Sequence, residues 1–272
     1  MTIAVIWQED GFQWCAADTR LTADNDQPTT EIATKIYAIP VVAAAHSGHH
    51  RQPHYWAQYG FVYAGAALPA SMTAVTASTF LQNLSRPGPR GNPPTFEEIA
   101  QLVHRLAERF MRERREFGGD GIFQAALFGW CPNASKYKIA HIEGRDDGGF
   151  RVELDYTRPP ATDGDPWLVL GNANQTFKST LAEYRKTEKQ ITRLVPRHVI
   201  DKMVVEERNK AVGGATSIGR VFQHGFQLCF AVKPDPLGRH TGPRGIFNGL
   251  DLETDIGQVG EYFVAIAGMP SS

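Results

Sequence analysis

The second residue of the chain has the groups needed for a nucleophile. Thr2 is small, so we expect Met1 to be removed and the mature chain to begin with a threonine that carries a hydroxyl and a free α-amine. An unperturbed α-amine has a pKa of roughly 7.7–8.0, so near neutral pH part of it is unprotonated and can accept the hydroxyl proton. One residue would then supply both the nucleophile and the base.

Such a nucleophile needs three further groups near it: a cation, a carboxylate that holds the cation, and backbone N–H donors for an oxyanion. Asp18 ends the second strand of a hairpin expected from the apolar segments 3–7 and 12–17 and their Asp-Gly turn. Lys35 directly precedes a third apolar segment. Each residue alone also has a non-catalytic interpretation. Threonine is common after an initiator methionine, Asp18 and Arg20 could form an ion pair in a turn, and Lys35 could lie on the surface.

Taken together and in this order, these residues resemble the proteasome β-subunit family, the N-terminal-nucleophile (Ntn) threonine peptidases that include bacterial proteasome homologues. The matching pattern is Thr2, the turn glycine Gly11, AADTRLT at 16–22 and the dipeptide Lys35-Ile36. A looser match is VYAGAA at 62–67, and a Gly-Asn-Ala turn at 171–173 stands where the family has Gly-Ser-Gly. The resemblance is motif-level over 2–84 and topological over about 120–232.

The resemblance implies a role for each matched position. Thr2 would be the nucleophile, Lys35 the cation that tunes it, and Asp18 the group that orients the lysine. Arg20 would support the site from behind, and the backbone N–H of Gly65 would bind the oxyanion. The other implied residues are Thr22 and Ala67 for the substrate backbone, Leu21 and Tyr63 for the walls of the first specificity pocket, and Ser217 from the family's Asp-x-x-Ser-Gly site.

Four features depart from the family pattern. Gly214 stands where the family has the aspartate of that Asp-x-x-Ser-Gly site, and Asn172 replaces the serine of the earlier turn. The turn glycine is one residue nearer to Thr2 than usual, and the interval from Asp18 to Lys35 is one residue longer. The environment of the α-amine therefore differs from the family's, which points to weak or narrow peptidase activity.

Four histidines form a competing cluster: His46, His49, His50 and His54. Their spacing could present imidazoles to a metal ion, but no cysteine accompanies them and no carboxylate is close in sequence. We expect an exposed loop there, with no metal and no cofactor. The sequence also lacks phosphate-binding GxxxxGK[ST], GxGxxG and the GxSxG elbow, so nucleotide hydrolysis would need a partner.

The remaining pattern predicts blocks of strands and helices. Strands are expected over 36–45, 60–66, 122–130, 137–142, 150–156, 220–232 and 261–267, and helices over 69–84, 95–110, 175–186 and 197–211. The segments 46–58, 85–94 and 233–246 are expected to be loops, the second because of its four prolines. This order favours an α+β fold with antiparallel sheets. The resemblance implies a four-layer αββα sandwich, as one domain over 2–272 with a family-atypical extension at 233–272.

Composition excludes several classes of protein. The chain has 272 residues, with 28 Lys and Arg against 29 Asp and Glu, which gives no electrostatic case for nucleic acid or an anionic membrane. No apolar stretch approaches the roughly 20 residues that span a bilayer, and a basic leader is lacking, so we expect a cytoplasmic protein. The three cysteines lie far apart and are expected to be buried thiols.

These observations favour a threonine-type hydrolase that cleaves peptide bonds in peptides or unfolded proteins. The resemblance implies a self-compartmentalised homo-oligomer, a ring or stacked assembly with Thr2 facing an inner cavity. The sequence does not indicate whether an ATP-dependent unfoldase delivers substrate to this assembly. Two alternatives stay open: a non-catalytic structural ring subunit with the same fold, and an Ntn amidase that acts on a small non-peptide amide.

Overall fold

The structure is a computed structural model of the whole chain. It describes residues 2–23, 27–47, 50–87, 91–187, 193–233, 244–264 and 266–270. The chain forms two compact units. The first unit consists of Met1–Ile36, Pro160–Arg220 and Gln227–Ser272, and the second of Tyr37–Pro159 and Val221–Phe226. The expectation of one domain stays a prediction.

The first unit contains an eight-stranded sheet among its described residues. Strands β11, β1, β2, β12, β13, β14 and β15 follow one another across it, and β18 also pairs with β13. The strands are β1 (Ala4–Glu9), β2 (Phe12–Asp18), β11 (Pro166–Leu170), β12 (Thr216–Phe222), β13 (Gly225–Lys233), β14 (Arg244–Phe247), β15 (Leu250–Asp251) and β18 (Ala267–Pro270). β1 pairs antiparallel with both β2 and β11, whereas β18 runs parallel to β13.

Two helices pack on this sheet and bury one core with it. They are α3 (Asn174–Thr187) and α4 (Val195–Val205). Ile3, which directly precedes β1, and the alternate β1 residues Val5 and Trp7 share this core with helix residues. The helix residues include Phe177 of α3 and Ile200 of α4. The alternation follows from the two-residue period of a strand, which turns every second side chain to the same face. Both helices were predicted, and α4 ends at Val205, six residues before the expected end.

The first unit also contains short paired segments. They are β3 (Leu21–Thr22) with β4 (Pro28–Thr30), β16 (Gln258–Val259) with β17 (Tyr262–Phe263), and the π-helical turn η2 (Leu252–Ile256). The strand predicted over 261–267 is thus limited to β17, and β18 begins only at residue 267. The expected single strand over 220–232 is wrong, because a turn at 223–224 divides it into β12 and β13.

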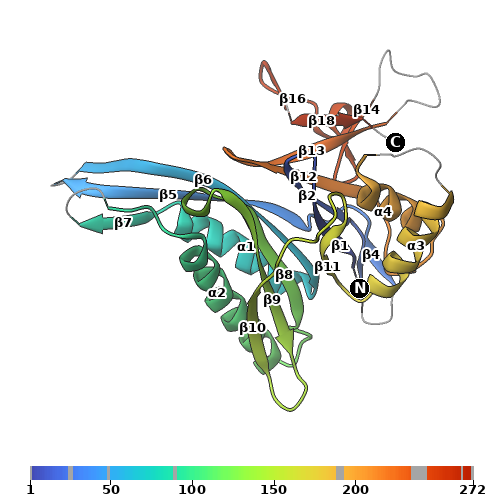
Figure 1. Cartoon of the computed structure of the whole chain (residues 1–272), viewed down its shortest axis with the longest axis horizontal. Coiled ribbons are helices and arrows are strands. Elements are labelled where there is room, and N and C mark those ends of the chain that lie inside the picture. The colour runs from blue at the N-terminus through green and yellow to red at the C-terminus, as the bar shows by residue number, and fades with distance from the viewer. Residues whose placement is uncertain are drawn as a thin grey trace. The chain divides into compact units, whose positions relative to one another are not determined.

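The second unit is built on a six-stranded sheet in the order β10, β9, β8, β6, β5 and β7. These strands are β5 (Ile36–Ser47), β6 (His50–Gly65), β7 (Leu84–Pro87), β8 (Phe123–Cys131), β9 (Lys136–Arg145) and β10 (Arg151–Tyr156), with a short 3-10 turn η1 (Pro132–Ala134) before β9. The helices α1 (Ala67–Leu81) and α2 (Phe96–Glu116) pack against each other and on this sheet (Figure 1). The predicted α+β character with mostly antiparallel sheets is therefore confirmed.

Helix α2 begins where its sequence signal places it. The side chain of Thr95 accepts a hydrogen bond from the backbone N–H of Glu98, and the Glu98 carboxylate accepts one from the backbone N–H of Thr95 at 2.7 Å. This reciprocal capping box satisfies two N–H groups that the helix itself leaves without partners. Phe96, Ile99 and Val103 then lie buried along one face. The predicted helix is confirmed and extends to Glu116.

One predicted loop is wrong, over 46–58, and a second, over 85–94, is wrong at residues 85–87. Residues 50–54 belong to β6 and residues 46–47 to β5, so the histidine-rich segment continues a pair of strands. Pairing of strands depends on backbone hydrogen bonds, which polar side chains do not prevent. Residues 84–87 form β7, parallel to β5. Pro87, one of the four prolines that predicted a loop, ends β7. An edge strand tolerates a missing N–H, and β7 is the last strand of its sheet. In the described residues, no helix is long and apolar enough to cross a membrane.

Candidate active site

The first hairpin brings Asp18 beside the start of the chain. Asp10 and Gly11 both have positive φ, 52° and 76°, as a tight two-residue hairpin turn requires. The register that follows pairs Ala4 with Ala17. One step beyond, the backbone N–H of Asp18 donates to the carbonyl of Ile3 at 3.3 Å, and the N–H of Ile3 donates to Asp18 Oδ1 at 3.1 Å. The carboxylate is therefore held next to Thr2 by the hairpin itself.

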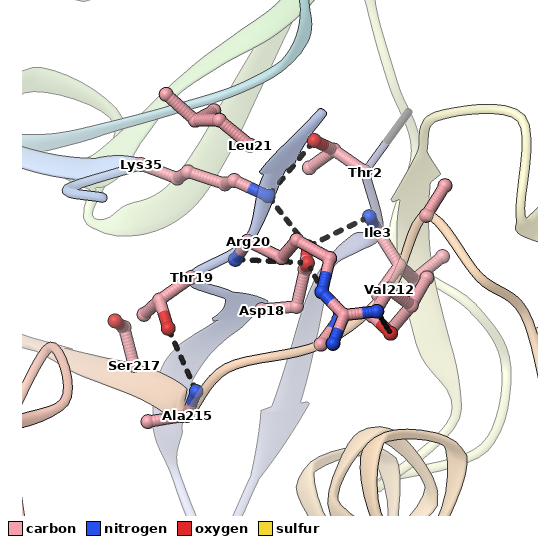
Figure 2. A network of polar contacts seen from close by, with 12 residues as sticks. Thr2, Ile3, Asp18, Thr19, Arg20, Leu21, Lys35, Val212, Ala215 and Ser217 are labelled. Carbon is pink, nitrogen blue, oxygen red and sulfur yellow. Dashed lines mark hydrogen bonds and ion pairs between the residues drawn. The ribbon is translucent and has the colours of Figure 1, made fainter. Parts of the chain in front are cut away.

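Lys35 completes a cluster of three polar side chains. Its Nζ lies 2.9 Å from Thr2 Oγ1 and 2.8 Å from Asp18 Oδ1 (Figure 2). The Asp18 and Lys35 side chains are fully buried, and Thr2 is 1% exposed. Lys35 comes from the irregular segment 31–35, just before β5, and the backbone N–H of Ala33 in this segment donates to the carbonyl of Thr19 at 2.9 Å. The structure thus brings together three residues that are 16 to 33 positions apart.

Burial determines the electrostatics of the cluster. It lowers the pKa of Lys35, because an ammonium group loses its hydration there, and the attraction of the adjacent Asp18 carboxylate partly offsets this shift. Asp18 in turn accepts hydrogen bonds at Oδ2 from the backbone N–H groups of Arg20, at 3.3 Å, and Gly213, at 3.2 Å. The carboxylate is therefore compensated by both the lysine and the backbone. A cation fixed against a threonine hydroxyl oxygen favours loss of the hydroxyl proton, which makes the oxygen a better nucleophile.

Arg20 lies next to this cluster, and its side chain donates hydrogen bonds to Glu31 and to the loop before β12. Its Nε donates to both carboxylate oxygens of Glu31, at 2.9 and 3.1 Å, and one terminal nitrogen donates to the carbonyl of Lys210 at 2.8 Å. Its side chain thus joins the segment that leads to Lys35 with the loop that precedes β12. Arg20 therefore occupies a supporting position beside the cluster.

The loop before β12 explains one departure from the family pattern. Gly214 has a φ of 75°, and a Cβ atom there would lie 2.4 Å from both the Glu31 carbonyl oxygen and Thr19 Oγ1. Thr19 Oγ1 itself donates to that carbonyl at 2.5 Å and accepts from the N–H of Ala215 at 2.7 Å. An aspartate cannot occupy this position unless the loop shifts. A second departure, Asn172, lies exposed in the turn before α3.

The other predicted site residues are distributed between the two units. Ser217 is on β12, 4% exposed, and Leu21 and Thr22 form β3 in the first unit. Tyr63, Gly65 and Ala67 belong to the second unit. Gly65 has a φ of 110°, and a Cβ atom there would meet the Ile122 carbonyl oxygen at 2.8 Å, so this position requires glycine. Tyr63 lies in the core of that unit, 6.4 Å from the ring of Tyr37.

Most of the predicted histidine cluster lies outside the described residues. His49 lies outside the described residues, as do the side chains of His46 and His50. Among the described residues, no group of three or more His, Cys, Asp or Glu side chains could hold a metal ion. His54 is partly buried and lines a cavity of about 420 Å³ in the second unit, together with residues of β5, β7 and the start of α2. The three cysteines are buried and free.

Sequence reasoning missed one residue near the candidate site, Asn248. Its side chain contacts both Ser217 and Thr34, the residue just before Lys35. Asn248 belongs to the extension 233–272, in which the sequence predicted no strand before residue 261. The dipeptide Asn248-Gly249 is the strongest short signal of a hairpin turn and could have identified β14 and β15. Its contact with the site was not visible in the sequence, because Thr34 is 214 positions away.

Comparisons with known proteins identify the fold. No family model matches the sequence, and no curated protein matches it. The structure is similar to that of the Anbu (Gly-1) mutant from Hyphomicrobium sp. strain MC1, with a TM-score of 0.50, 16% sequence identity and 80% of each chain covered. That protein is a bacterial proteasome-like Ntn-hydrolase homologue. At this identity the likeness concerns the fold alone.

Proposed function

We propose that this chain is a threonine-type N-terminal-nucleophile hydrolase that cleaves peptide bonds after Met1 has been removed. The observation that carries the proposal is the buried contact of Lys35 Nζ with both Thr2 Oγ1 and Asp18 Oδ1. Burial of a lysine ammonium group costs free energy unless the charge is paired. Here the ammonium group is fully buried and lies against a hydroxyl and a carboxylate. The similar fold of a proteasome-like homologue adds support.

The proposed reaction proceeds in two halves. The hydroxyl oxygen of Thr2 attacks the carbonyl carbon, and its proton passes to the α-amine of the same residue. The amine gives this proton to the leaving nitrogen as the C–N bond breaks, which leaves an ester on Thr2. Water then attacks the ester and returns one proton, by way of the amine, to the threonine oxygen. Lys35 stabilises the negative charge that develops on this oxygen, and Asp18 holds the lysine in place.

The wider site and assembly are proposed from the family resemblance. The backbone N–H of Gly65 would bind the oxyanion, and Thr22 and Ala67 would pair with an extended peptide. Leu21 and Tyr63 would line the first specificity pocket. The proposal includes the four-layer αββα sandwich and a self-compartmentalised homo-oligomer that takes peptides or unfolded proteins. It needs no cofactor.

The intact mass of the purified protein tests the proposal directly. It is measured before and after incubation with a threonine-directed β-lactone. We expect a mass without Met1 that gains one adduct. Thr2→Ala should abolish the gain and Thr2→Ser should retain it, because serine keeps the hydroxyl. Thr79→Ala is the matched control, since Thr79 lies exposed on α1 and its hydroxyl donates to the Val75 carbonyl of the same helix.

Other results would lead to other functions. Retained Met1 would refute the mechanism, because the α-amine would then be part of a peptide bond. A processed but unreactive Thr2 would favour the structural ring subunit. The packing around Gly214 favours this alternative in particular, because it leaves no room for the aspartate that the family has at this position. Turnover of small amides without cleavage of peptides would identify an Ntn amidase instead.

A further inference from the structure

We propose that the turn between β14 and β15 is part of the Thr2 site, with Asn248 as a positioning residue for Lys35. This inference rests on the proposed function. It extends the site to a segment of the chain for which the family resemblance assigns no counterpart. All residues involved lie in the first unit.

The turn has a defined and compact geometry. Phe247 pairs with Leu250, so the turn itself consists of the two residues Asn248 and Gly249. Their φ angles are 50° and 88°, both in the left-handed region that asparagine and glycine adopt at the least cost. The backbone at the tip of this hairpin therefore has a defined conformation, which fixes the position of the Asn248 Cβ atom.

The tip packs closely against the segment that leads to Lys35. A Cβ atom on Gly249 would lie 2.8 Å from Ile32 Cγ2 and 3.5 Å from the Glu31 carbonyl oxygen. Only a residue without a side chain leaves room for this approach. The segment 31–35 has no helix or strand of its own, so its shape depends on contacts of this kind.

Asn248 joins this segment to β12 through two hydrogen bonds. Ser217 Oγ donates to Asn248 Oδ1 at 2.5 Å, and Asn248 Nδ2 donates to Thr34 Oγ1 at 3.0 Å. Ser217 and Asn248 are only 4% and 7% exposed, so water cannot readily replace either bond. Thr34 is bonded directly to Lys35 in the chain. The Asn248 amide thus fixes the point from which the lysine side chain reaches towards Thr2.

This position complements the supports on the other side of the segment. Thr19 and Arg20 hold residues 31 and 33 from the end of the first hairpin. Asn248 holds residue 34 from β14–β15 and is the described side chain that ties this residue to β12 through Ser217. Without it, Lys35 would keep its ion pair with Asp18 but lose the restraint on its backbone. The lysine would then lie against Thr2 Oγ1 for a smaller fraction of the time.

The test compares Asn248→Ala with Asn83→Ala, a matched control in which the asparagine is exposed and bonds within the end of α1. Asn248→Asp keeps the size and the acceptor for Ser217 but cannot donate to Thr34. Two quantities are measured: the second-order rate of Thr2 labelling by the β-lactone from pH 6 to pH 9, and the hydrogen exchange of the peptide that spans 31–36.

We expect labelling by Asn248→Ala to be about tenfold slower. Of the two hydrogen bonds that this variant loses, the one to Thr34 restrains the segment that carries Lys35. The midpoint of its pH profile should move to higher pH, because a displaced cation no longer favours the alkoxide; a merely structural role would leave this midpoint unchanged. Exchange in 31–36 should be faster in both Asn248 variants and unchanged in Asn83→Ala.

Every outcome decides the inference. Wild-type rate, pH midpoint and exchange in Asn248→Ala would overturn it. If Asn248→Ala does not fold, Asn248→Asp decides by the same measurements. If the processed wild-type protein does not react but exchange in 31–36 rises in the variants, the proposed hydrolase is refuted and the positioning by Asn248 is supported.

Discussion

Removal of Lys35 should destabilise the protein more than removal of the proposed nucleophile, and both changes should abolish labelling of Thr2. Lys35→Met keeps an apolar chain of similar length but leaves the Asp18 carboxylate fully buried without its cation. Breaking a buried ion pair from one side typically costs 3–5 kcal/mol, and we expect about 3 kcal/mol here, because three backbone N–H groups still donate to Asp18. Thr2→Ala loses a hydrogen bond to Lys35 and should cost about 1 kcal/mol.

Urea unfolding followed by tryptophan fluorescence measures this difference. Trp7 and Trp14 are buried on the same hairpin as Asp18, with ring centroids 6.3 Å apart, so they report on the unit that holds the site. With an m value of about 3 kcal/mol/M, the expected difference of about 2 kcal/mol separates the two midpoints by about 0.7 M urea. Protein concentration must be equal in all samples, because assembly would also shift the midpoint.

Two results would refute this reasoning. Equal midpoints for Lys35→Met and Thr2→Ala would mean that no buried charge depends on Lys35. A double variant, Asp18→Asn with Lys35→Met, that is less stable than Lys35→Met alone would mean the same, since removal of the unpaired charge should offset part of the loss. The Thr79→Ala protein should unfold at a midpoint close to that of the wild type.

Three further predictions concern other parts of the chain. Thr95→Ala removes the N-cap of α2 and should lower the free energy of unfolding by about 1 kcal/mol, as urea titration would show; no change would mean that the cap is not formed. Gly214→Asp should lower Tm and not accelerate labelling, because a side chain at a φ of 75° costs at least about 1 kcal/mol before its clash with Glu31 and Thr19 is counted; faster labelling would contradict this. Burial, and then the charge of Arg197, lower the pKa of His198 from 6.5, so the unfolded chain binds a proton first as the pH falls. The stabilisation by neutral His198 is thus complete above pH 6.5 and is lost as the pH falls towards the folded-state pKa, by at most about 1.4 kcal/mol per pH unit. His198→Phe should make Tm less dependent on pH between 7.5 and 5, and an unchanged dependence would exclude this group as its source.

The sequence by itself determined the parts of the site that depend on local geometry. Asp10 and Gly11 form a turn that few other pairs adopt, and this turn sets the register that places Asp18 beside the beginning of the chain. Thr95 and Glu98 likewise fix the start of α2 within four residues. Such features are readable because the dihedral preference of a residue and the period of a strand or helix act over a few positions.

Only the tertiary structure decided which residues from distant segments meet. The sequence placed Lys35 before a strand, but the fold determines that its Nζ lies between Thr2 and Asp18. Polar and proline-containing segments became β6 and β7 because strand partners were available at those positions, which no local pattern reveals. Asn248 reaches Thr34 across 214 positions because β12, β13, β14 and β15 lie in succession in one sheet. A contact of this kind depends on the registers of several strand pairs together, and therefore no single stretch of sequence encodes it.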